Sequence, residues 1–502
     1  MMADVRVRSG AIAGLTGALA MSAWFFAARL IFGVPTPSEM FADASAPLIP
    51  VHLFGLLIGF AHGYTPLKIL GFASVVAGQL AVGALGGAAF VARAQRSVRF
   101  LIVFACAAWL LTAGVFSSVL LTNYRGRPAP FSVILTVASL AVGFAVFALL
   151  TWWCAPAPVL SPSTSPDRAA KTSRVRWIAG GVAALVAAAG WQRIFARATF
   201  SYDGRTELGP DVVAVTPNER FFCVTKNFAD PNVDASAWRL TVTGAVRQPL
   251  TLDFAAVSRL PFVDQETTLM CINNGPGDGL MSNAIWRGVP LRALVAAAGP
   301  HEDIVRVVLH AADSYSDTIP FDKAMEQTTL VAYRMNGVEL SPKHGFPVRM
   351  IVPGWFGEKN VKWLRSIELV TEPVRGFYER QGWGPTFRIP THARFDAPNF
   401  TQPLRFGAPV ELRGVAFCGD RGVARVQVSD DDGRSWRDAT FTSHFAPLAW
   451  RLWRYEWRPA RAGTYRLAVR AWDAHGNVQT ATDRPAETDG ATGYHRIVAH
   501  VV

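Results

Sequence analysis

The pattern of hydrophobic and polar positions divides the chain near residue 200. Before that point, five apolar stretches come close to the roughly 20 residues that a helix needs to cross the hydrocarbon core of a membrane. These stretches cover residues 10–33, 67–92, 98–121, 131–153 and 176–195. The pattern therefore predicts a polytopic membrane domain of about five transmembrane helices over residues 1–200.

A shorter apolar segment, "PLIPVHLFGLLIGFAHGY" (47–64), follows the first stretch and is bracketed by proline and glycine. We interpret it as a re-entrant or interfacial helix, with a full membrane span as the alternative. Five spans place the N-terminal "VRVR" inside the cell and six place it outside. The choice leaves the later part of the chain on the same side.

Beyond residue 205 the hydrophobic runs become short. "WRLTVTGAV" (238–246) and "VRVVLHAA" (305–312) have the composition of strands, whereas "PLRALVAAAG" (290–299) has helical spacing and a terminal glycine. These runs predict a mixed α+β domain over residues 205–390. Alternating strands with Asp-Gly and Ala-Gly turns then predict an immunoglobulin-like β-sandwich over residues 391–502.

Charge is distributed as unevenly as hydropathy. Residues 1–200 contain 15 Lys and Arg against 4 Asp and Glu, while the remainder has 34 against 33. A nucleic-acid-binding face would place excess positive charge on the soluble portion, so that class is excluded. The basic loops "RAQRSVR" (93–99) and "DRAAKTSRVR" (167–176) are expected to be cytoplasmic. The soluble portion then lies on the other side, in the periplasm or outside the cell.

The five cysteines are scattered, which argues against a disulfide framework or a structural zinc site. Cys271 differs from the rest, because "TTLMC" reads as a strand that ends at a glycine-rich turn, "INNGPGDG". A thiol in that position is accessible to a ligand. Cys223 and Cys418 are interpreted as packing residues.

Several stretches, in order, resemble the sulfite oxidase family of molybdopterin enzymes in its membrane-anchored bacterial branch. They are "FFCVTKNFADPNVD" (221–234), "TLMCINN" (268–274), "AIWRGVPL" (284–291), "HGFPVR" (344–349), "VPGWFGEKNVKWL" (352–364) and "VQVSDDDGRSW" (426–436). The resemblance covers about residues 215–500. It implies a molybdopterin-binding catalytic domain, a dimerisation-type sandwich, a molybdenum cofactor, a homodimer and a location in the bacterial inner membrane.

The resemblance also assigns residues. It makes Cys271 the molybdenum ligand, and a soft thiolate suits such a centre. The residues expected to bind the cofactor are Phe222, Asn227, Asp313, His344, Arg349, Asn360 and Lys362. Asp313 corresponds to the acid that bonds the pterin ring, and Lys362 to a partner of the pterin phosphate. Gly354 and Gly357 are expected to let the backbone approach the anion.

The substrate side departs from the pattern of sulfite-oxidising members. Lys226 stands where they have arginine, Pro276 replaces an arginine after the metal-binding cysteine, and Trp383 aligns with their active-site tyrosine. Lysine is a poorer bidentate anion ligand than arginine. We therefore expect two-electron oxygen-atom transfer that reduces a neutral S-oxide or N-oxide, with Lys226 and Trp383 as catalytic residues. Sulfite oxidation, with help from Arg425, is the alternative.

The electron partner is expected to be a membrane quinone or a separate haem protein. No "HPGG" segment typical of a cytochrome b5 domain is present. His52 and His62 would lie about 15 Å apart on one helix, too far to ligate one iron, so no haem is predicted. The remaining alternative is a cofactor-free, membrane-tethered binding module.

Overall fold

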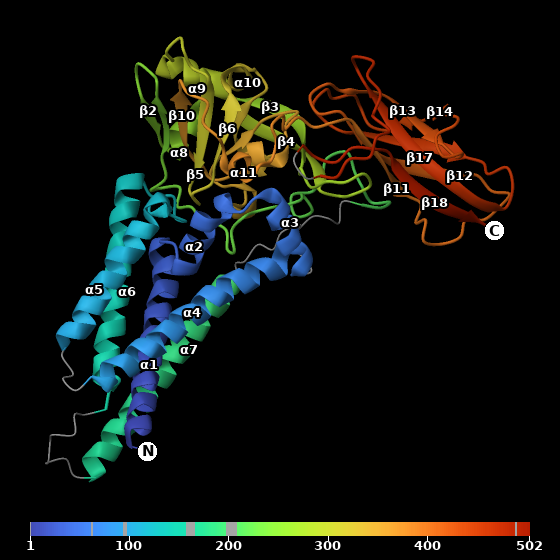
Figure 1. Cartoon of the computed structure of the whole chain (residues 1–502). Coiled ribbons are helices and arrows are strands. Elements are labelled where there is room, and N and C mark those ends of the chain that lie inside the picture. The colour runs from blue at the N-terminus through green and yellow to red at the C-terminus, as the bar shows by residue number, and fades with distance from the viewer. Residues whose placement is uncertain (1, 62–63, 94–97, 157–165, 197–207, 487–488) are drawn as a thin grey trace.

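The computed structural model describes the chain except for residues 1, 62–63, 94–97, 157–165, 197–207 and 487–488. His62 and residues 94–97 of the first basic loop therefore lie outside the described residues, and the second basic stretch, 167–176, forms the beginning of a helix whose side chains there are not described. A bundle of long helices is followed by a mixed domain at one end of it and then by a β-sandwich beside the mixed domain (Figure 1).

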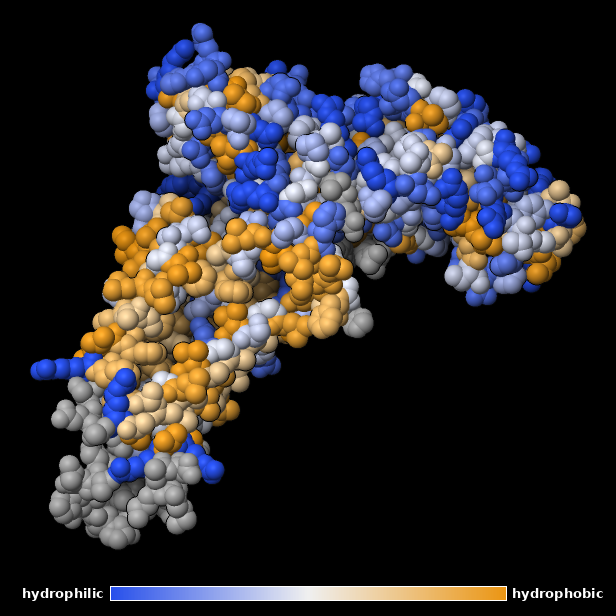
Figure 2. All heavy atoms as spheres, in the orientation of Figure 1, coloured by the Kyte–Doolittle hydropathy of each residue, from blue (hydrophilic) through white to orange (hydrophobic). Residues whose placement is uncertain are grey.

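The helical region contains α1 (Met2–Phe32), α2 (Pro37–Ser45), α3 (Val51–Phe60), α4 (Tyr64–Ala92), α5 (Val98–Val115), α6 (Ala129–Cys154) and α7 (Pro166–Phe195). Four segments in the described part are long and apolar enough to cross a membrane: Arg6–Phe32, Thr65–Ala92, Val98–Val115 and Ala129–Cys154. The fifth predicted span falls in α7, where several side chains lie outside the described residues. Figure 2 shows apolar residues over these helices and polar residues over the other two parts.

The segment interpreted as re-entrant or interfacial forms a short 3₁₀ turn (Ala46–Leu48) and then α3. Ten residues of α-helix extend about 15 Å, half the thickness of a hydrocarbon core. This helix alone is too short for a full span, and the position of the segment relative to the membrane stays a prediction. The helix lies where the bundle meets the mixed domain (Figure 1).

Close approach of α1 and α4 depends on small residues. A Cβ added at Gly14 would lie 2.0 Å from the carbonyl oxygen of Gly83, and one at Gly87 would lie 2.3 Å from that of Gly10. Larger side chains cannot occupy this contact. Helices that pack in an apolar environment commonly use such small-residue contacts.

The mixed domain contains two sheets. The first has the order β2-β1-β10-β5-β6, built from β1 (Leu240–Gly244), β2 (Leu250–Leu252), β5 (Arg306–Ala311), β6 (Ser316–Pro320) and β10 (Leu364–Val370). The second has the order β3-β4-β7-β8, with β9 on β7, built from β3 (Val263–Met270), β4 (Met281–Pro290), β7 (Leu330–Met335), β8 (Val338–Glu339) and β9 (Arg349–Ile351). The helices of this domain are α8 (Phe254–Arg259), α9 (Leu291–Ala298), α10 (Phe321–Met325) and α11 (Phe377–Gln381).

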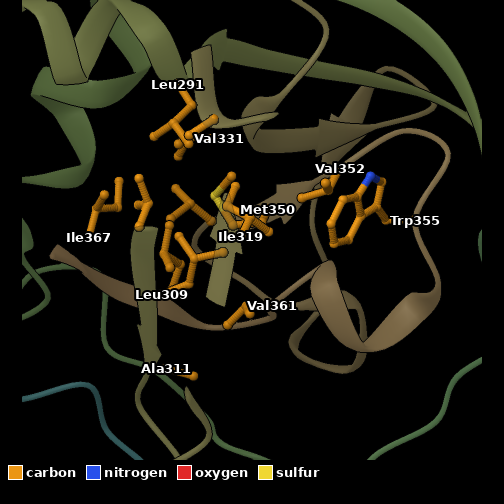
Figure 3. Packing of buried hydrophobic residues seen from close by; sticks show 14 of the residues in the cluster. Leu291, Leu309, Ala311, Ile319, Val331, Met350, Val352, Trp355, Val361 and Ile367 are labelled. Atoms are coloured by element: carbon orange, nitrogen blue, oxygen red, sulfur yellow. The ribbon is translucent and has the colours of Figure 1, made fainter. Parts of the chain in front are cut away.

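These elements confirm the strands predicted at 238–246 and 305–312 and the helix predicted at 290–299. Gly299 ends α9 at a φ of +64°, a conformation that glycine adopts without steric cost. The main core lies against the first sheet, where Leu309 of β5 pairs with Ile367 of β10. Figure 3 shows these side chains packed with Ile319 and Met350.

The sandwich pairs two four-stranded sheets, β11-β12-β16-β15 and β14-β13-β17-β18. Their strands are β11 (His392–Ala397), β12 (Val410–Phe417), β13 (Val423–Ser429), β14 (Arg437–Asp438), β15 (Thr440–Phe441), β16 (Arg451–Trp457), β17 (Gly463–Asp473) and β18 (His495–Val501). Cys418 is fully buried in its core, as predicted. The predicted β-sandwich is confirmed.

Candidate active site

One pocket of the mixed domain collects residues from segments far apart in the chain. Nine residues predicted for the site line it: Phe222, Lys226, Cys271, Asp313, His344, Arg349, Asn360, Lys362 and Trp383. The tenth, Asn227, lies behind the wall and donates a 2.7 Å hydrogen bond to Asp313. The sequence motifs therefore converge in space, and the roles assigned to their residues stay predictions.

Cys271 is positioned by a hairpin. β3 and β4 remain in register to Met270 opposite Met281, and the Cys271 amide then donates to the carbonyl of Leu280 at 3.0 Å. The thiol is buried, which raises its pKa to about 12, and the carboxyl of Glu358 adds to the rise. The backbone amides of Ile272 and Asn273 act in the opposite direction by favouring the thiolate.

A cluster of basic residues forms a second part of the pocket: Lys343, His344, Arg349 and Lys362. The Arg349 guanidinium donates to the carbonyls of His344 and Asn360, both at 3.1 Å. Burial lowers its pKa to about 10. Its Nε has no partner, and no carboxylate lies within ion-pair distance among the described residues. A buried cation without an anion is costly, so this cluster is suited to an anionic ligand.

His344 is neutral and fixed in one tautomer. Its Nε2–H donates to the Asn218 carbonyl at 2.7 Å, and burial lowers its pKa to about 4. Asn360 accepts from the Val352 amide at 2.7 Å and donates to two backbone carbonyls. The side chain of Asn360 therefore holds the loop through hydrogen bonds to the backbone, while the backbone carbonyl of Asn360 accepts from Arg349.

Cys223, interpreted as a packing residue, is 3% exposed and also lines the pocket wall. Lys362 Nζ lies 3.4 Å from its sulfur and donates to the Lys343 carbonyl at 3.1 Å. Burial raises the pKa of the Cys223 thiol, while Lys362 opposes the rise. No regular element spans residues 221–226, and strand alternation therefore could not predict the direction of this side chain.

An aromatic cluster occupies the remaining wall: Tyr315, Tyr378 and Trp383. Tyr378 contacts Tyr315 at 5.8 Å and Trp383 at 6.4 Å between ring centroids. The indole Nε1–H of Trp383 is buried and has no acceptor among the described residues. The sequence analysis missed both tyrosines, although Tyr378 lies five residues before Trp383 in the same motif.

Glu358 is a further pocket residue that the sequence analysis did not assign. Burial raises its pKa to about 8, and its Oε1 has no hydrogen-bond partner among the described residues. Its position inside "GWFGEKN" was available as a signal. In the same stretch the family resemblance assigned only Asn360 and Lys362.

Two expectations about the pocket are wrong. Arg425 does not reach it, because its guanidinium pairs with Asp438 at 2.6 and 2.9 Å on an exposed face of the sandwich. Gly354 does not approach a ligand, since a Cβ there would lie 2.4 Å from the carboxyl carbon of Asp420 in the sandwich. Gly357 does line the pocket, and a Cβ there would meet the Met270 carbonyl at 3.4 Å.

The helical region completes the pocket. Phe54 of α3 lines it, and Asp43 of α2 pairs with Lys226. Gln381, two residues before Trp383, donates to the Ala46 carbonyl at 2.6 Å. The helices therefore contact the pocket near Lys226 and Trp383 directly.

Comparisons with known proteins agree with this geometry. Residues 227–378 match the oxidoreductase molybdopterin binding domain, and residues 389–501 match the Mo-co oxidoreductase dimerisation domain. Sulfite oxidase of Gallus gallus is 33% identical over 321 residues, which cover 54% of this chain and 69% of that protein. The uncharacterized oxidoreductase YuiH of Bacillus subtilis is 32% identical over 36% of this chain and 92% of its own length.

The crystal structure of the sulfane dehydrogenase SoxCD from Paracoccus pantotrophus has a TM-score of 0.52 and 23% identity. The match covers 60% of this chain and 86% of that one, and at this identity it supports the fold alone. The chain spans between 58% and 69% of the length of the vertebrate sulfite oxidases that it matches.

Proposed function

The chain belongs to the sulfite oxidase family of molybdenum cofactor-dependent oxidoreductases, and from this membership we propose that it is a membrane-bound enzyme that reduces a neutral S-oxide or N-oxide. The molybdenum–molybdopterin group supplies two-electron oxygen-atom transfer when it is bound, and the protein positions the reactants. Reduction of a sulfoxide consumes two electrons and two protons and releases a thioether and water.

The residues of the pocket fit that cofactor. Cys271 offers a soft sulfur ligand, and the amides of Ile272 and Asn273 favour its thiolate form. Arg349 offers a buried guanidinium whose Nε lacks a partner among the described residues, and Lys362 adds a second cation for a pterin phosphate. Asp313, supported by Asn227, offers a carboxylate to the pterin ring. In this assignment Phe222 and His344 form the wall beside the pterin.

The observation that carries the choice of substrate is the free indole donor of Trp383. Its Nε1–H is buried in the same pocket as Cys271 and has no acceptor among the described residues. The oxygen of an S-oxide or N-oxide is a strong acceptor and satisfies this donor without bringing net charge into the pocket. Phe54, Phe222 and Ile272 supply apolar walls that exclude water from the reacting oxygen.

Sulfite oxidation is the second candidate, because Lys226 supplies a cation in the pocket wall. Two assays on one molybdenum-loaded preparation of the full chain in detergent separate the candidates. We expect turnover of methionine sulfoxide with a reduced viologen and little turnover of sulfite with an artificial acceptor. Sulfite turnover at a micromolar KM, the range typical of physiological substrates, without sulfoxide turnover would contradict the proposal.

The same assay tests Trp383. Trp383→Phe removes the donor and keeps an aromatic wall, so we expect kcat/KM for the sulfoxide to fall about tenfold, the usual size for one lost hydrogen bond. Trp472→Phe is the matched control, because this tryptophan donates to Gln427 within the sandwich. Equal kcat/KM values for Trp383→Phe and the wild type would contradict the role.

We further propose that the apolar helices cross the bacterial inner membrane with the catalytic portion in the periplasm. Four helices of sufficient length and the positions of the basic loops support this orientation. A quinol or a separate haem protein then delivers electrons from the membrane side. Reporter fusions after residues 160 and 210 test the topology, and a periplasmic reporter that is inactive at 210 would contradict it.

A further inference from the structure

The charge of Lys226 is neutralised from outside the mixed domain. Its ammonium lies 2.5 Å from Asp43 Oδ1, and the two side chains are only 7% and 9% exposed. Asp43 belongs to α2 of the helical region, 183 residues earlier in the chain. The wall of the pocket therefore contains an ion pair whose two halves come from different parts of the molecule.

The hydrogen-bonding capacity of Lys226 is also used. An ammonium has three N–H donors, and this one donates to Asp43, to the Asp313 carbonyl at 2.8 Å and to Asn227 Oδ1 at 3.4 Å. The other oxygen of Asp43 accepts a 2.7 Å hydrogen bond from Ser314. An oxyanion in the pocket therefore meets neither an uncompensated charge nor a free donor on Lys226.

The helix that carries Asp43 is held firmly. Thr36 and Glu39 form a capping box at the start of α2, and Glu39 pairs with Arg29 of α1 at 2.9 Å. Arg29 also donates to the Ala229 carbonyl at 2.8 Å. Lys68 of α4 donates to the carbonyls of Thr225 and Asn227. We call Arg29, Asp43 and Lys68 the clamp residues, because all three hold segment 225–229 of the mixed domain.

We infer that Asp43 is a specificity-determining residue. By neutralising the charge of Lys226, it makes the pocket select a neutral oxide over an oxyanion. This inference rests on the proposed function and names the feature that sets its substrate class. The ammonium of Lys226 in the pocket wall is paired with Asp43 and lies near a second carboxylate, Asp313. A buried dianion requires cations that are not already paired. Removal of the Asp43 charge leaves a buried ammonium for which an anion is the natural partner.

The test is the Asp43→Asn variant of the molybdenum-loaded full chain in detergent, with sulfate as the probe. Isothermal titration calorimetry measures the dissociation constant of sulfate, a readout independent of turnover. We expect sulfate to bind at least about tenfold more tightly than in the wild type, since one unit charge near the anion is unmasked. Sulfate should also inhibit sulfoxide reduction at correspondingly lower concentration.

The double variant Asp43→Asn with Lys226→Gln should return sulfate affinity to the wild-type level, because the gain comes from Lys226. Glu302→Gln is the charge control, as this residue lies exposed on a loop of the mixed domain. Unchanged sulfate affinity in folded Asp43→Asn, or a gain that survives Lys226→Gln, would overturn the inference. If Asp43→Asn does not fold, the single variant Lys226→Gln tests the inference. Weaker sulfate binding than in the wild type would show that the charge of Lys226 already attracts the anion, and would overturn the inference.

Failure of this inference is distinguishable from failure of the proposed function. Wild-type enzyme that oxidises sulfite and does not reduce sulfoxides overturns the proposed function whatever Asp43 does. Wild-type enzyme that reduces sulfoxides, together with an Asp43→Asn variant that binds sulfate no more tightly, overturns the role of Asp43 alone.

Discussion

Several single residues in the pocket carry polar groups that the protein itself leaves without partners. Arg349 Nε, Trp383 Nε1 and Glu358 Oε1 are buried and lack hydrogen bonds among the described residues. Each such group costs about 1–3 kcal/mol if it stays unsatisfied. Their gathering in one pocket is expected where a polar ligand completes them. The pocket is therefore suited to binding a polar ligand.

We propose Cys271 as the residue on which cofactor binding depends most directly. Cys271→Ser replaces the soft sulfur ligand by a hydroxyl, so we expect turnover to fall at least about a hundredfold, the upper range seen even for changes outside the ligand shell. The free energy of unfolding should change by less than about 2 kcal/mol. Activity, molybdenum content and thermal melting measure the three quantities.

Cys106→Ser is the matched control, because Cys106 lies exposed on α5. Its turnover should equal that of the wild type. A Cys271→Ser variant that keeps normal turnover would show that the thiol is not the metal ligand.

The sequence motifs predicted those pocket residues that lie near one another in the chain. Arg349, Asn360 and Lys362 fall within two short stretches and meet in the pocket as expected. Asp43 could not be predicted, because nothing local marks one acid in a nine-residue helix as the partner of Lys226. Arg425 was misassigned because strand alternation does not specify which face of a sandwich points toward another domain.

At the scale of elements, two strands of the sandwich carry neutral histidines, one buried and one half-buried. His392 of β11 is 4% exposed, and its Nε2 has no partner among the described residues. His495 of β18 accepts a 3.0 Å hydrogen bond from the Phe395 amide. Burial lowers the pKa of both to about 4, and the nearby Arg394 contributes. The folded strands therefore exclude the imidazolium form.

Acid should weaken these strands between pH 6.5 and about 4. In that window the unfolded chain binds protons that the folded chain excludes, so stability falls as the pH is lowered. Each histidine should cost about 1.4 kcal/mol per pH unit. Thermal or denaturant unfolding at pH 7.0 and pH 5.5 measures the loss, and His392→Gln should reduce it.

His475→Gln, in an exposed turn of the sandwich, is the control and should leave the loss as in the wild type. An identical pH dependence for the wild type and His392→Gln would count against the burial of a neutral imidazole at position 392.

Helices and strands could be predicted where hydrophobic residues recur at a regular spacing. Their ends could not be predicted where that spacing is irregular. The strand that precedes Cys271 ends at Met270, as the glycine-rich turn indicated. The apolar stretch 98–121 ends as a helix already at Val115, because a 3₁₀ turn at Ser117–Val119 takes over. Hydropathy alone does not distinguish these two backbone forms.

At the scale of the whole molecule, the sandwich lies to one side of the mixed domain, away from the helices (Figure 1). Its match to a dimerisation domain leads us to expect a homodimer. Light scattering with subtraction of bound detergent should give twice the 54.5 kDa of one chain. A monomeric mass across a range of protein concentrations would contradict this expectation.

The order of the three parts was predictable from hydropathy, while their mutual contacts were not. Helical periodicity specifies which residues share a face of α1 or α4, but it does not reveal that Arg29 and Lys68 reach backbone carbonyls some 160 to 200 residues later. Such contacts join a side chain to the main chain. They leave no complementary residue type in the sequence to detect.

The clamp residues have a consequence for how such a protein can be recombined. If the helices were only a tether, a chimera could join the helices of one relative to the catalytic part of another at the linker near residue 200. Here that junction would separate Arg29, Asp43 and Lys68 from the segment 225–229 that they hold. A chimera must therefore take the helices and segment 225–229 from the same parent protein, with the junction placed beyond residue 229 in the mixed domain.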